Sequence, residues 1–410
     1  MARADRPADR PDSPQGANDP TRREFFRTFG RETVRQAGAV AGAAAELRRS
    51  SVAAARVLFD PETAVSEVPP ATKATVDATF RSAYRFTGDD LVVLDVRELP
   101  GRVETVSLRE PSEIASAMRV GAINAGPVLA EVGAYAMVLA ARVAATRPGI
   151  GRHQQMRAAA GTLRAARPAV KALAWAVDRM ESRDDKLVEA GADPGAMANA
   201  LRADADAIAS EATEAQAAIG RIGARAIPPP PEGPINLLIH GDMGPLACGM
   251  VGMGTALVQA LRDAGREVHA WLTDAAPSHE GGRLSAFQMR QLGFPHTVVP
   301  DSAVAWLLDN QRIDAVLLRG DRVCANGDAG VLIGGLGAAR LAADAGVPIH
   351  VLAPLCSIDP AARDGKEIRG LTSFVPGAVH DVIPADLITS FFTESGILTP
   401  PYGPAIGRVL

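Results

Sequence analysis

A run of four prolines splits this chain into two segments with different hydrophobic patterns. Proline lacks a backbone N–H and its ring clashes with the preceding helical turn, so Ile227-Pro-Pro-Pro-Pro-Glu-Gly-Pro234 cannot continue a helix. A proline-rich stretch of this kind favours an extended spacer. We therefore predict a linker at residues 227–234 between two folded parts.

The part before the linker has the pattern of packed helices. Apolar residues recur at spacings of three and four between about Pro111 and Ile222. Two short apolar runs precede them, Leu91–Asp95 and Val103–Val106, and these favour a strand hairpin. Residues 85–226 are therefore predicted to form a mainly helical domain with a small hairpin.

The part after the linker alternates between strand, glycine-rich turn and helix. Its clearest strands are continuous apolar runs, at Ile235–His240, Val268–Thr273, Ala315–Leu318 and Ile349–Leu352. Such strands alternating with helices indicate a parallel sheet covered on both faces. The predicted fold class is α/β, with the helical N-terminal domain followed by a Rossmann-like parallel-sheet domain over residues 235–410. In sheets of this class, ligands bind at the carboxyl ends of the strands.

The first 84 residues lie outside both parts. Residues 1–22 are rich in Pro, Asp and Arg and are predicted to be a disordered tail, whereas residues 23–84 are predicted to form a helical extension. The segment Thr21–Arg27, TRREFFR, resembles a twin-arginine export motif. An export signal needs an apolar stretch after it, and charged residues at positions 31, 32 and 35 interrupt that stretch. The pattern favours a basic amphipathic helix in a cytoplasmic protein.

Composition and charge argue against several classes of function. The net charge of −4 lacks the basic excess of a nucleic-acid-binding protein. No run of 18 apolar residues predicts a membrane span. Three widely spaced cysteines, at positions 248, 324 and 356, predict neither a disulfide framework nor a zinc site, and no metal is expected.

Polar residues follow three of the predicted strands, where a ligand site is expected. They occur in His240–Gly244, in Arg319–Asp328 and in Ala353–Asp359. Glycines in the first segment let the backbone approach a ligand, and a helix N-terminus can bind an anion. The second holds two aspartates, two arginines and an asparagine, a density of polar groups that is costly to bury unless paired.

Gly320-Asp321-Arg322 is followed by Ala325-Asn326-Gly327-Asp328. These residues look like the GADRI-x-ANGD segment of the methylthioribose-1-phosphate isomerase and initiation-factor-2B-like family. Three further segments resemble its other motifs in the same order, namely Leu173–Met180, Ala353–Ile368 and Pro384–Tyr402. The resemblance covers roughly residues 85–405 and implies the family fold.

The resemblance implies an aldose–ketose isomerisation of a ribose 1-phosphate derivative, as in methionine salvage. Family enzymes open the furanose and move hydrogen between C1 and C2, using a cysteine and the aspartate of GADR as acid and base. Asp321 matches that aspartate and is the first catalytic candidate. The family also implies a homodimer and a small sugar phosphate as substrate. No cofactor is expected, because Gly241-Asp242-Met243-Gly244 lacks the GxGxxG order of a dinucleotide site.

The chain departs from the family at the cysteine. Gly241 stands where the catalytic cysteine belongs. Asp242 is the preferred substitute, because two close carboxylates would raise the pKa of one and provide an acid and a base. Cys248 and Cys324 are alternatives, although free cysteines are more often small buried packing residues.

Departures also affect the phosphate site. The family's phosphate loop, RGAPAIG, is here Asn124–Val128, without its arginine; Glu280 replaces a glutamine, and Val331-Leu332 replaces an Asn-Lys pair. Arg167 is the one phosphate-facing arginine carried over. The predicted substrate-binding residues are Arg167, His240, Gly241, Gly244, Glu280, Asn326 and Asp328.

These losses leave two alternatives to the isomerase. One is a non-catalytic protein like the regulatory subunits of initiation factor 2B, with the N-terminal extension as a docking element. The other is an enzyme of the same fold whose substrate lacks a phosphate, because phosphate recognition depends on charge-assisted hydrogen bonds.

Overall fold

The computed structural model describes residues 83–146, 150–310, 312–369 and 380–410. The predicted tail, most of the predicted N-terminal extension and the TRREFFR segment lie outside these residues. Among the described residues, no helix is both long and apolar enough to cross a membrane.

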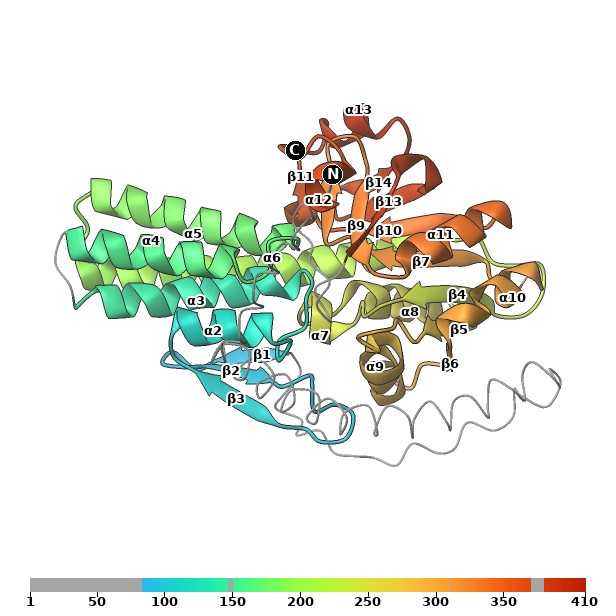
Figure 1. Ribbon diagram of the computed structural model, residues 1–410, viewed down its shortest axis with the longest axis horizontal. Coiled ribbons are helices and arrows are strands. Elements are labelled where there is room, and N and C mark those ends of the chain that lie inside the picture. The colour runs from blue at the N-terminus through green and yellow to red at the C-terminus, as the bar shows by residue number, and fades with distance from the viewer. Residues whose placement is uncertain (1–82, 147–149, 311, 370–379) are drawn as a thin grey trace, which may run out of the picture. The chain divides into compact units, whose positions relative to one another are not determined.

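The described residues before the proline run form a small sheet and five helices (Figure 1). The sheet is antiparallel and contains β1 (Tyr84–Phe86), β2 (Leu91–Leu94) and β3 (Thr105–Leu108). The helices are α2 (Pro111–Arg119), α3 (Val128–Ala144), α4 (Ile150–Arg164), α5 (Lys171–Glu189) and α6 (Pro194–Ala226). The predicted hairpin is confirmed as β2 and β3, while β1 was not predicted.

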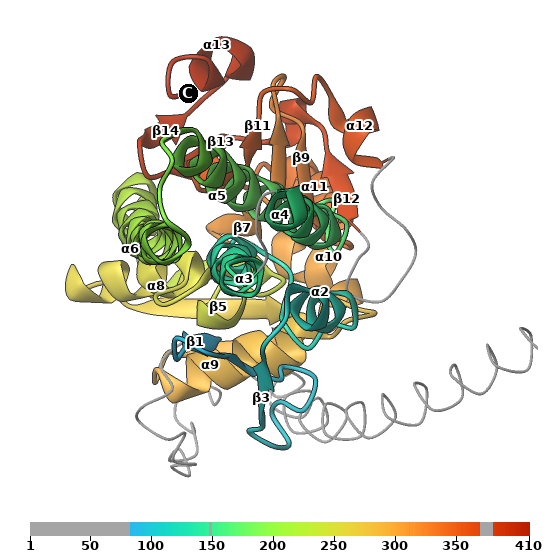
Figure 2. The same ribbon diagram turned by 90° about the vertical axis from the view of Figure 1, so that its left-hand side faces the viewer.

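Helices α3 to α6 lie side by side, and Figure 2 shows them nearly end-on. Their shared core consists largely of Ala, Leu, Val and Met side chains. The break between α5 and α6 follows from a local signal, because Pro194 occupies the first turn of α6 and Asp193 accepts hydrogen bonds from the N–H groups of Gly195 and Ala196. Beyond this bundle, α6 also packs on the α/β half, against α8 and β13.

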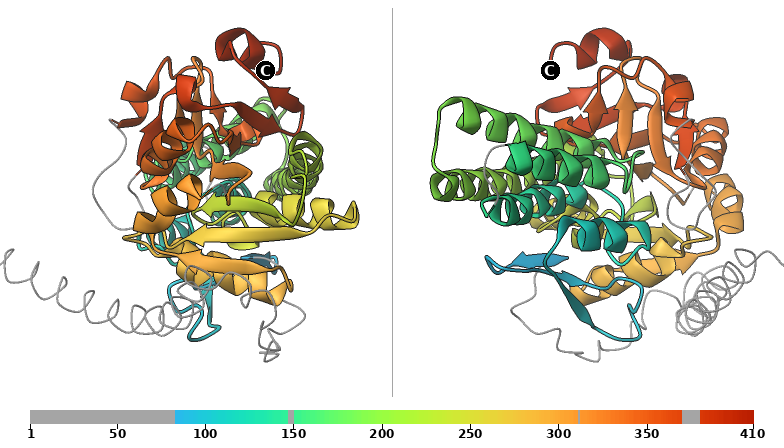
Figure 3. Two further views of the ribbon diagram at one scale, coloured as in Figure 1. Left: turned by 90° about the vertical axis from the view of Figure 1, so that its right-hand side faces the viewer. Right: turned by 60° about the vertical axis from the view of Figure 1, so that its left-hand side comes forward.

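The residues after Pro234 form the α/β half (Figure 3). Its strands are β4 (Ile235–His240), β5 (Val268–Thr273), β6 (His296–Val299), β7 (Ala315–Arg319), β8 (Arg322–Cys324), β9 (Ala329–Leu332), β10 (Ile349–Leu352), β11 (Ile358–Asp359), β12 (His380–Ile383), β13 (Ser390–Thr393) and β14 (Gly396–Leu398). Its helices are α7 (Pro245–Cys248), α8 (Met253–Asp263), a π-helical turn (Gly281–Ser285), α9 (Ala286–Gln291), α10 (Val304–Asp309), α11 (Gly335–Asp344), α12 (Gly365–Arg369) and α13 (Tyr402–Ile406).

The main sheet has seven strands in the order β14-β13-β10-β7-β4-β5-β6. All neighbours pair in parallel except β13 and β14, which are antiparallel. Alternate residues of β4 enter different cores: Leu238 packs with α10 and α11, whereas Leu237 and Ile239 pack with α6 and α8. The predicted sheet covered on both faces is confirmed, with an antiparallel strand at one edge.

A second sheet was not predicted. Four short strands form it in the order β11-β8-β9-β12, with β8 and β11 parallel and the other pairs antiparallel. The polar segment Arg319–Asp328 therefore contains a strand, β8, rather than a loop alone. This sheet positions β12 beside the end of β7, which matters for the site below.

Glu131 of α3 provides a test of the helical core by pH. Its Oε2 accepts a hydrogen bond of 2.6 Å from the Tyr84 hydroxyl, and burial raises the pKa of Glu131 from its ordinary value of 4.5 to about 8. The folded protein therefore holds this proton more tightly than the unfolded chain, so stability declines as pH rises between these two values. We expect Glu131→Gln to leave stability nearly unchanged near pH 5 and to raise it by roughly a few kcal/mol near pH 9. Denaturant unfolding at both pH values checks this, and equal effects at the two would contradict it.

Candidate active site

The carboxyl ends of β4 and β7 bring two aspartates and an arginine together. The two strands are parallel neighbours, with His240 paired to Leu318, so both end at the same edge of the sheet. Asp242 follows β4, Arg319 ends β7 and Asp321 follows it. Arg319 Nη1 donates to the backbone oxygen of Asp242 and so connects the two strand ends.

Asp321 is completely buried and is held by two cationic or potentially cationic side chains. Arg319 donates to it through Nε at 2.7 Å and Nη2 at 3.2 Å, and His380 of β12 contacts its Oδ2 through Nε2 at 3.0 Å. Burial alone would raise the pKa of Asp321, but Arg319 and His380 together hold that pKa well below its usual range. Asp321 is therefore ionised in this arrangement.

Asp242 is equally buried, but its surroundings are different. Its carboxylate accepts hydrogen bonds from Asn124 Nδ2 at 3.0 Å, Gln288 Nε2 at 2.8 Å and the Gly244 N–H at 2.9 Å. Burial raises the pKa of Asp242, and these donors together with Arg319 offset only part of that rise. The two aspartates therefore have pKa values displaced in opposite directions, so their environments separate an ionised carboxylate, Asp321, from one that holds its proton more tightly, Asp242.

The cause of this displacement differs from the prediction. We predicted that repulsion between two carboxylates would raise one of the pKa values. Burial is instead the main cause for Asp242, and the low pKa of Asp321 comes from Arg319 and His380.

Glu280 lies in the same cluster, at the end of a strained turn. Ala275 and His279 in this turn have φ angles of 57° and 55°, which are unfavourable for residues other than glycine, and the π-helical turn starts directly after Glu280. Burial raises the pKa of Glu280. Its Oε2 lies 3.9 Å from Arg319 Nη1 and makes no hydrogen bond with the described residues. Strain and an unsatisfied buried oxygen are typical of a ligand site.

Two other predicted ligands at the end of β4 are used by the protein itself. His240 contacts Thr273 Oγ1 through Nδ1 and the backbone oxygen of Ile333 through Nε2, each at 2.8 Å. Both ring nitrogens are therefore engaged, which suits the predicted orienting role better than that of a base. The Gly244 N–H binds Asp242 rather than pointing to open space.

The backbone conformation at position 241 favours glycine. Its φ of 81° lies in the left-handed region, and a Cβ there would approach Leu332 Cδ2 to 3.1 Å. A cysteine at this position would thus meet both backbone strain and a hydrophobic side chain.

The remaining predicted residues lie on two other segments. Asn326 is exposed, and its side-chain oxygen accepts from the Asp328 N–H, while Asp328 accepts from the N–H groups of Gly365 and Ala385. These bonds hold the loop after β8, and substrate binding by this pair stays a prediction. Arg167 is buried, donates through Nε to the Met118 carbonyl at 2.8 Å and interacts electrostatically with Glu280 and Asp321.

The two cysteines considered as substitutes are not activated. Burial raises the pKa of both Cys248 and Cys324 to about 12. A thiol with such a pKa is almost entirely protonated at neutral pH and is a poor nucleophile or base. These values favour the packing interpretation.

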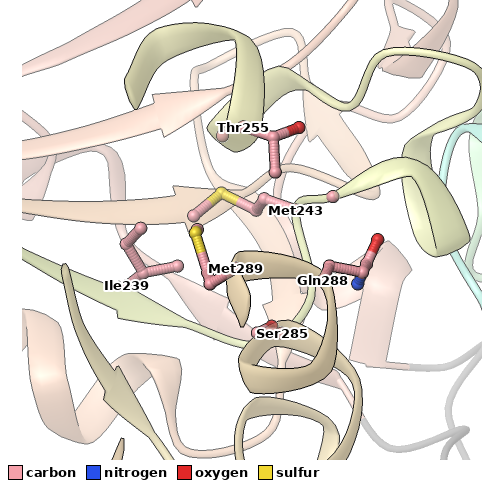
Figure 4. A pocket seen from close by; sticks show the side chains of 8 residues that line it. Ile239, Met243, Thr255, Ser285, Gln288 and Met289 are labelled. Carbon is pink, nitrogen blue, oxygen red and sulfur yellow. The ribbon is translucent and has the colours of Figure 1, made fainter. Parts of the chain in front are cut away.

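A small enclosed cavity adjoins the cluster (Figure 4). Its lining is mainly apolar, with Ile239, Met243 and Met289 on one side and Gln288 and Ser285 on the other. At about 10 Å³ it has room for one water molecule rather than a sugar. Gln288 joins it to the site, because this side chain also donates to Asp242.

No group of three or more His, Cys, Asp or Glu side chains in the described part of the chain is arranged to hold a metal ion.

Comparison with known proteins identifies the family. The profile of the initiation factor 2 subunit family matches residues 123–400. The chain belongs to this family. The match begins after α2 and extends into both halves of the described structure. It includes the residues of the strand-end cluster, namely Asn124, Arg167, Asp242, Glu280, Gln288, Arg319, Asp321 and His380.

Relatives named as methylthioribose-1-phosphate isomerases match most of the chain. A methylthioribose-1-phosphate isomerase of Synechococcus sp. is 34% identical over 346 residues, which cover 79% of this chain and 97% of the relative. One from Desulforudis audaxviator is 32% identical over 78% of this chain and 95% of its own length.

Solved structures share the fold. The 5-methylthioribose 1-phosphate isomerase of Pyrococcus horikoshii matches with a TM-score of 0.67 and 25% identity, over 80% of this chain and 95% of that one. The delta subunit of the initiation factor eIF-2B from A. fulgidus matches with a TM-score of 0.62 and 23% identity, over 80% of this chain and 98% of that one, a likeness of fold alone. The resemblance identified from motifs is confirmed.

Four residues of the site were not predicted as site residues. Arg319 was noted only as part of a polar segment, Asn124 as a position that had lost an arginine, and Gln288 and His380 not at all. Arg319 had a usable signal, because an arginine that ends an apolar strand must find a buried partner.

Proposed function

We propose that this chain is an aldose–ketose isomerase acting on a ribose 1-phosphate derivative, S-methyl-5-thioribose 1-phosphate in the first instance. The relatives named as such isomerases, at 34% and 32% identity over nearly their whole length, support this reaction. The observation that carries the proposal is the pair of strand-end carboxyl groups, Asp242 and Asp321, with oppositely displaced pKa values.

The reaction needs four proton transfers, two to the substrate and two from it. Protonation of the ring oxygen lets the C1–O4 bond break while a base removes the proton from C2, which leaves an enol across C1 and C2. A proton then adds to C1, and the C2 hydroxyl loses its proton to give the ketone. One acid and one base carry out both steps and return to their starting states.

The two aspartates fit these roles. Asp242, whose raised pKa favours the protonated form, gives its proton to the ring oxygen and later accepts the C2 hydroxyl proton. Asp321, ionised and at the neighbouring strand end, takes the proton from C2 and returns it to C1. Arg167 and Glu280, both buried in the same cluster, would hold the phosphate and a sugar hydroxyl respectively.

A direct assay tests this proposal. The purified full chain is incubated with S-methyl-5-thioribose 1-phosphate in heavy water, and the product is followed by NMR. We expect the ketose 1-phosphate to form, with deuterium at C1 to the extent that the proton on Asp321 exchanges with solvent before it is returned. A complete lack of ketose formation would remove the isomerase function. Undiminished ketose formation by Asp321→Asn would instead remove the role of Asp321 as the base.

One observation favours a non-catalytic alternative. Gly241 and Leu332 occupy positions where the family resemblance places a cysteine and a lysine, and they lie against each other. Such a site could sense a ligand without converting it, as the resemblance to regulatory subunits of initiation factor 2B implies. A third possibility is an enzyme whose substrate lacks a phosphate. Conversion of S-methyl-5-thioribose 1-phosphate to its ketose would exclude this possibility and the non-catalytic one.

The quaternary structure and location are part of the same proposal. We expect a cytoplasmic homodimer without a nucleic-acid partner, in keeping with relatives named as metabolic enzymes. Light scattering of the full chain measures its mass in solution and so tests whether it is a dimer.

A further inference from the structure

Arg319 contacts acidic residues or their backbone on three different segments. It is 3% exposed and lies within reach of two carboxylates, Asp321 at 2.7 Å and Glu280 at 3.9 Å, and of the Asp242 backbone oxygen. Burial works against its charge, but Asp321 and Glu280 raise its pKa overall. Arg319 is therefore a permanent cation in the centre of the cluster.

This cation conflicts with the role of Asp321 as base. A carboxylate held by Arg319 and His380 has a strongly lowered pKa and removes protons from carbon poorly, because a general base works best with a pKa near the working pH. The resting arrangement therefore protects Asp321 from reacting. For Asp321 to act as a base, its hydrogen bonds with Arg319 must weaken.

An incoming phosphate is a competing partner for this guanidinium. A buried phosphate needs cations and charge-assisted hydrogen bonds, and Arg167 alone provides few of them. Arg319 Nη1 donates to the Asp242 backbone oxygen and lies 3.9 Å from Glu280 Oε2. Gly126, in the segment that resembles the family's phosphate loop, packs directly against the guanidinium, because a Cβ added there would lie 3.2 Å from Arg319 Nε and 2.4 Å from the Ala247 backbone oxygen. The segment that resembles the phosphate loop is therefore in direct contact with Arg319, and a phosphate held by that segment would lie next to the guanidinium.

We infer that Arg319 is shared between Asp321 and the phosphate of the substrate, so that phosphate binding releases Asp321 to act as the base. This inference rests on the proposed function and adds a positioning residue to it. The charged and titratable groups around the pair are His380 of β12, Asp242 and Cys248 after β4, Glu280 before the π-helical turn and Arg167 between α4 and α5.

The inference makes a reciprocal prediction about binding. If Asp321 and phosphate compete for Arg319, removing the Asp321 charge must tighten phosphate binding through Arg319. Inorganic phosphate is titrated by calorimetry into the wild type, Asp321→Asn, Arg319→Gln and the double variant. We expect Asp321→Asn to bind about tenfold tighter and Arg319→Gln about tenfold weaker, with no gain from Asp321→Asn once Arg319 is gone.

Two results would overturn the inference. One is phosphate binding by Arg319→Gln as tight as in the wild type. The other is an equal gain from Asp321→Asn in both backgrounds, which would show simple removal of a negative charge. Should Arg319→Gln not fold, Arg319→Lys keeps the charge and replaces it in the cycle, with an expected affinity between those of Gln and Arg because lysine lacks the planar fork.

A kinetic readout separates a positioning role from a structural one. In the wild type, the acid limb of kcat should lie at higher pH than that of kcat/KM, because the bound phosphate draws Arg319 away and raises the pKa of Asp321. In Arg319→Lys the two limbs should move closer together, and an unchanged separation would count against the inference. The calorimetric cycle needs no turnover. It therefore remains informative if the isomerase function fails, whereas turnover combined with an additive cycle refutes only the role of Arg319.

Discussion

Asp321→Asn is expected to lower the isomerase rate by about 100- to 10,000-fold, the usual contribution of a general base. The substitution keeps the shape of the side chain and an oxygen that can accept from Arg319, but it removes the group that takes the C2 proton. The loss should fall on kcat, since Arg319 becomes more available to the phosphate and substrate binding is not weakened. Steady-state kinetics of the variant with S-methyl-5-thioribose 1-phosphate measures both constants.

A matched control distinguishes lost chemistry from lost stability. Breaking a buried ion pair costs about 3–5 kcal/mol wherever it lies. Asp184, 1% exposed and paired with Arg152 between α5 and α4, makes the same kind of buried pair outside the strand-end cluster. Asp184→Asn should therefore be destabilised like Asp321→Asn while retaining its kcat. Equal loss of kcat in both variants would assign the effect to folding and not to Asp321.

The parts of the fold that could be predicted are those with a local signal. Strands β4, β5, β7 and β10 are continuous apolar runs between glycine-rich turns, and the sequence shows them directly. The four-stranded sheet has no such signal. Its strand β11 has two residues and β8 has three, and both exist because they pair with each other across the chain. Pairing of this kind depends on tertiary contacts that periodicity does not encode.

The same distinction applies to the site. Asp242 and Asp321 could be predicted, because the carboxyl ends of neighbouring parallel strands meet at one edge. The direction of each pKa depends on residues that are distant in sequence, since Asn124 lies 118 positions before Asp242 and His380 lies 59 after Asp321. The charge of Arg319 is evident in the sequence, but its contacts with both strand ends follow only from the proximity of those ends in the folded chain.

Gly281→Ala is expected to destabilise the protein by about 3 kcal/mol or more, a large effect for one methyl group. A Cβ at this position would lie 1.6 Å from the backbone oxygen of Thr273, far inside van der Waals contact. Because that oxygen belongs to the last residue of the buried strand β5, neither side can move cheaply. The π-helical turn would have to shift instead, and Glu280 directly before it would shift as well. We therefore expect the variant to lose isomerase activity together with stability.

The comparison variant is Gly337→Ala, an exposed position in α11 where an added Cβ meets nothing within 4 Å. Alanine has the higher helix propensity, so this variant should be unchanged or more stable by about 0.5–1 kcal/mol. Denaturant unfolding of the two variants beside the wild type gives the difference in stability. A Gly281→Ala protein as stable and active as Gly337→Ala would mean that the turn before the π-helix accommodates a side chain. The strained geometry that holds Glu280 beside Arg319 would then not be needed for the site.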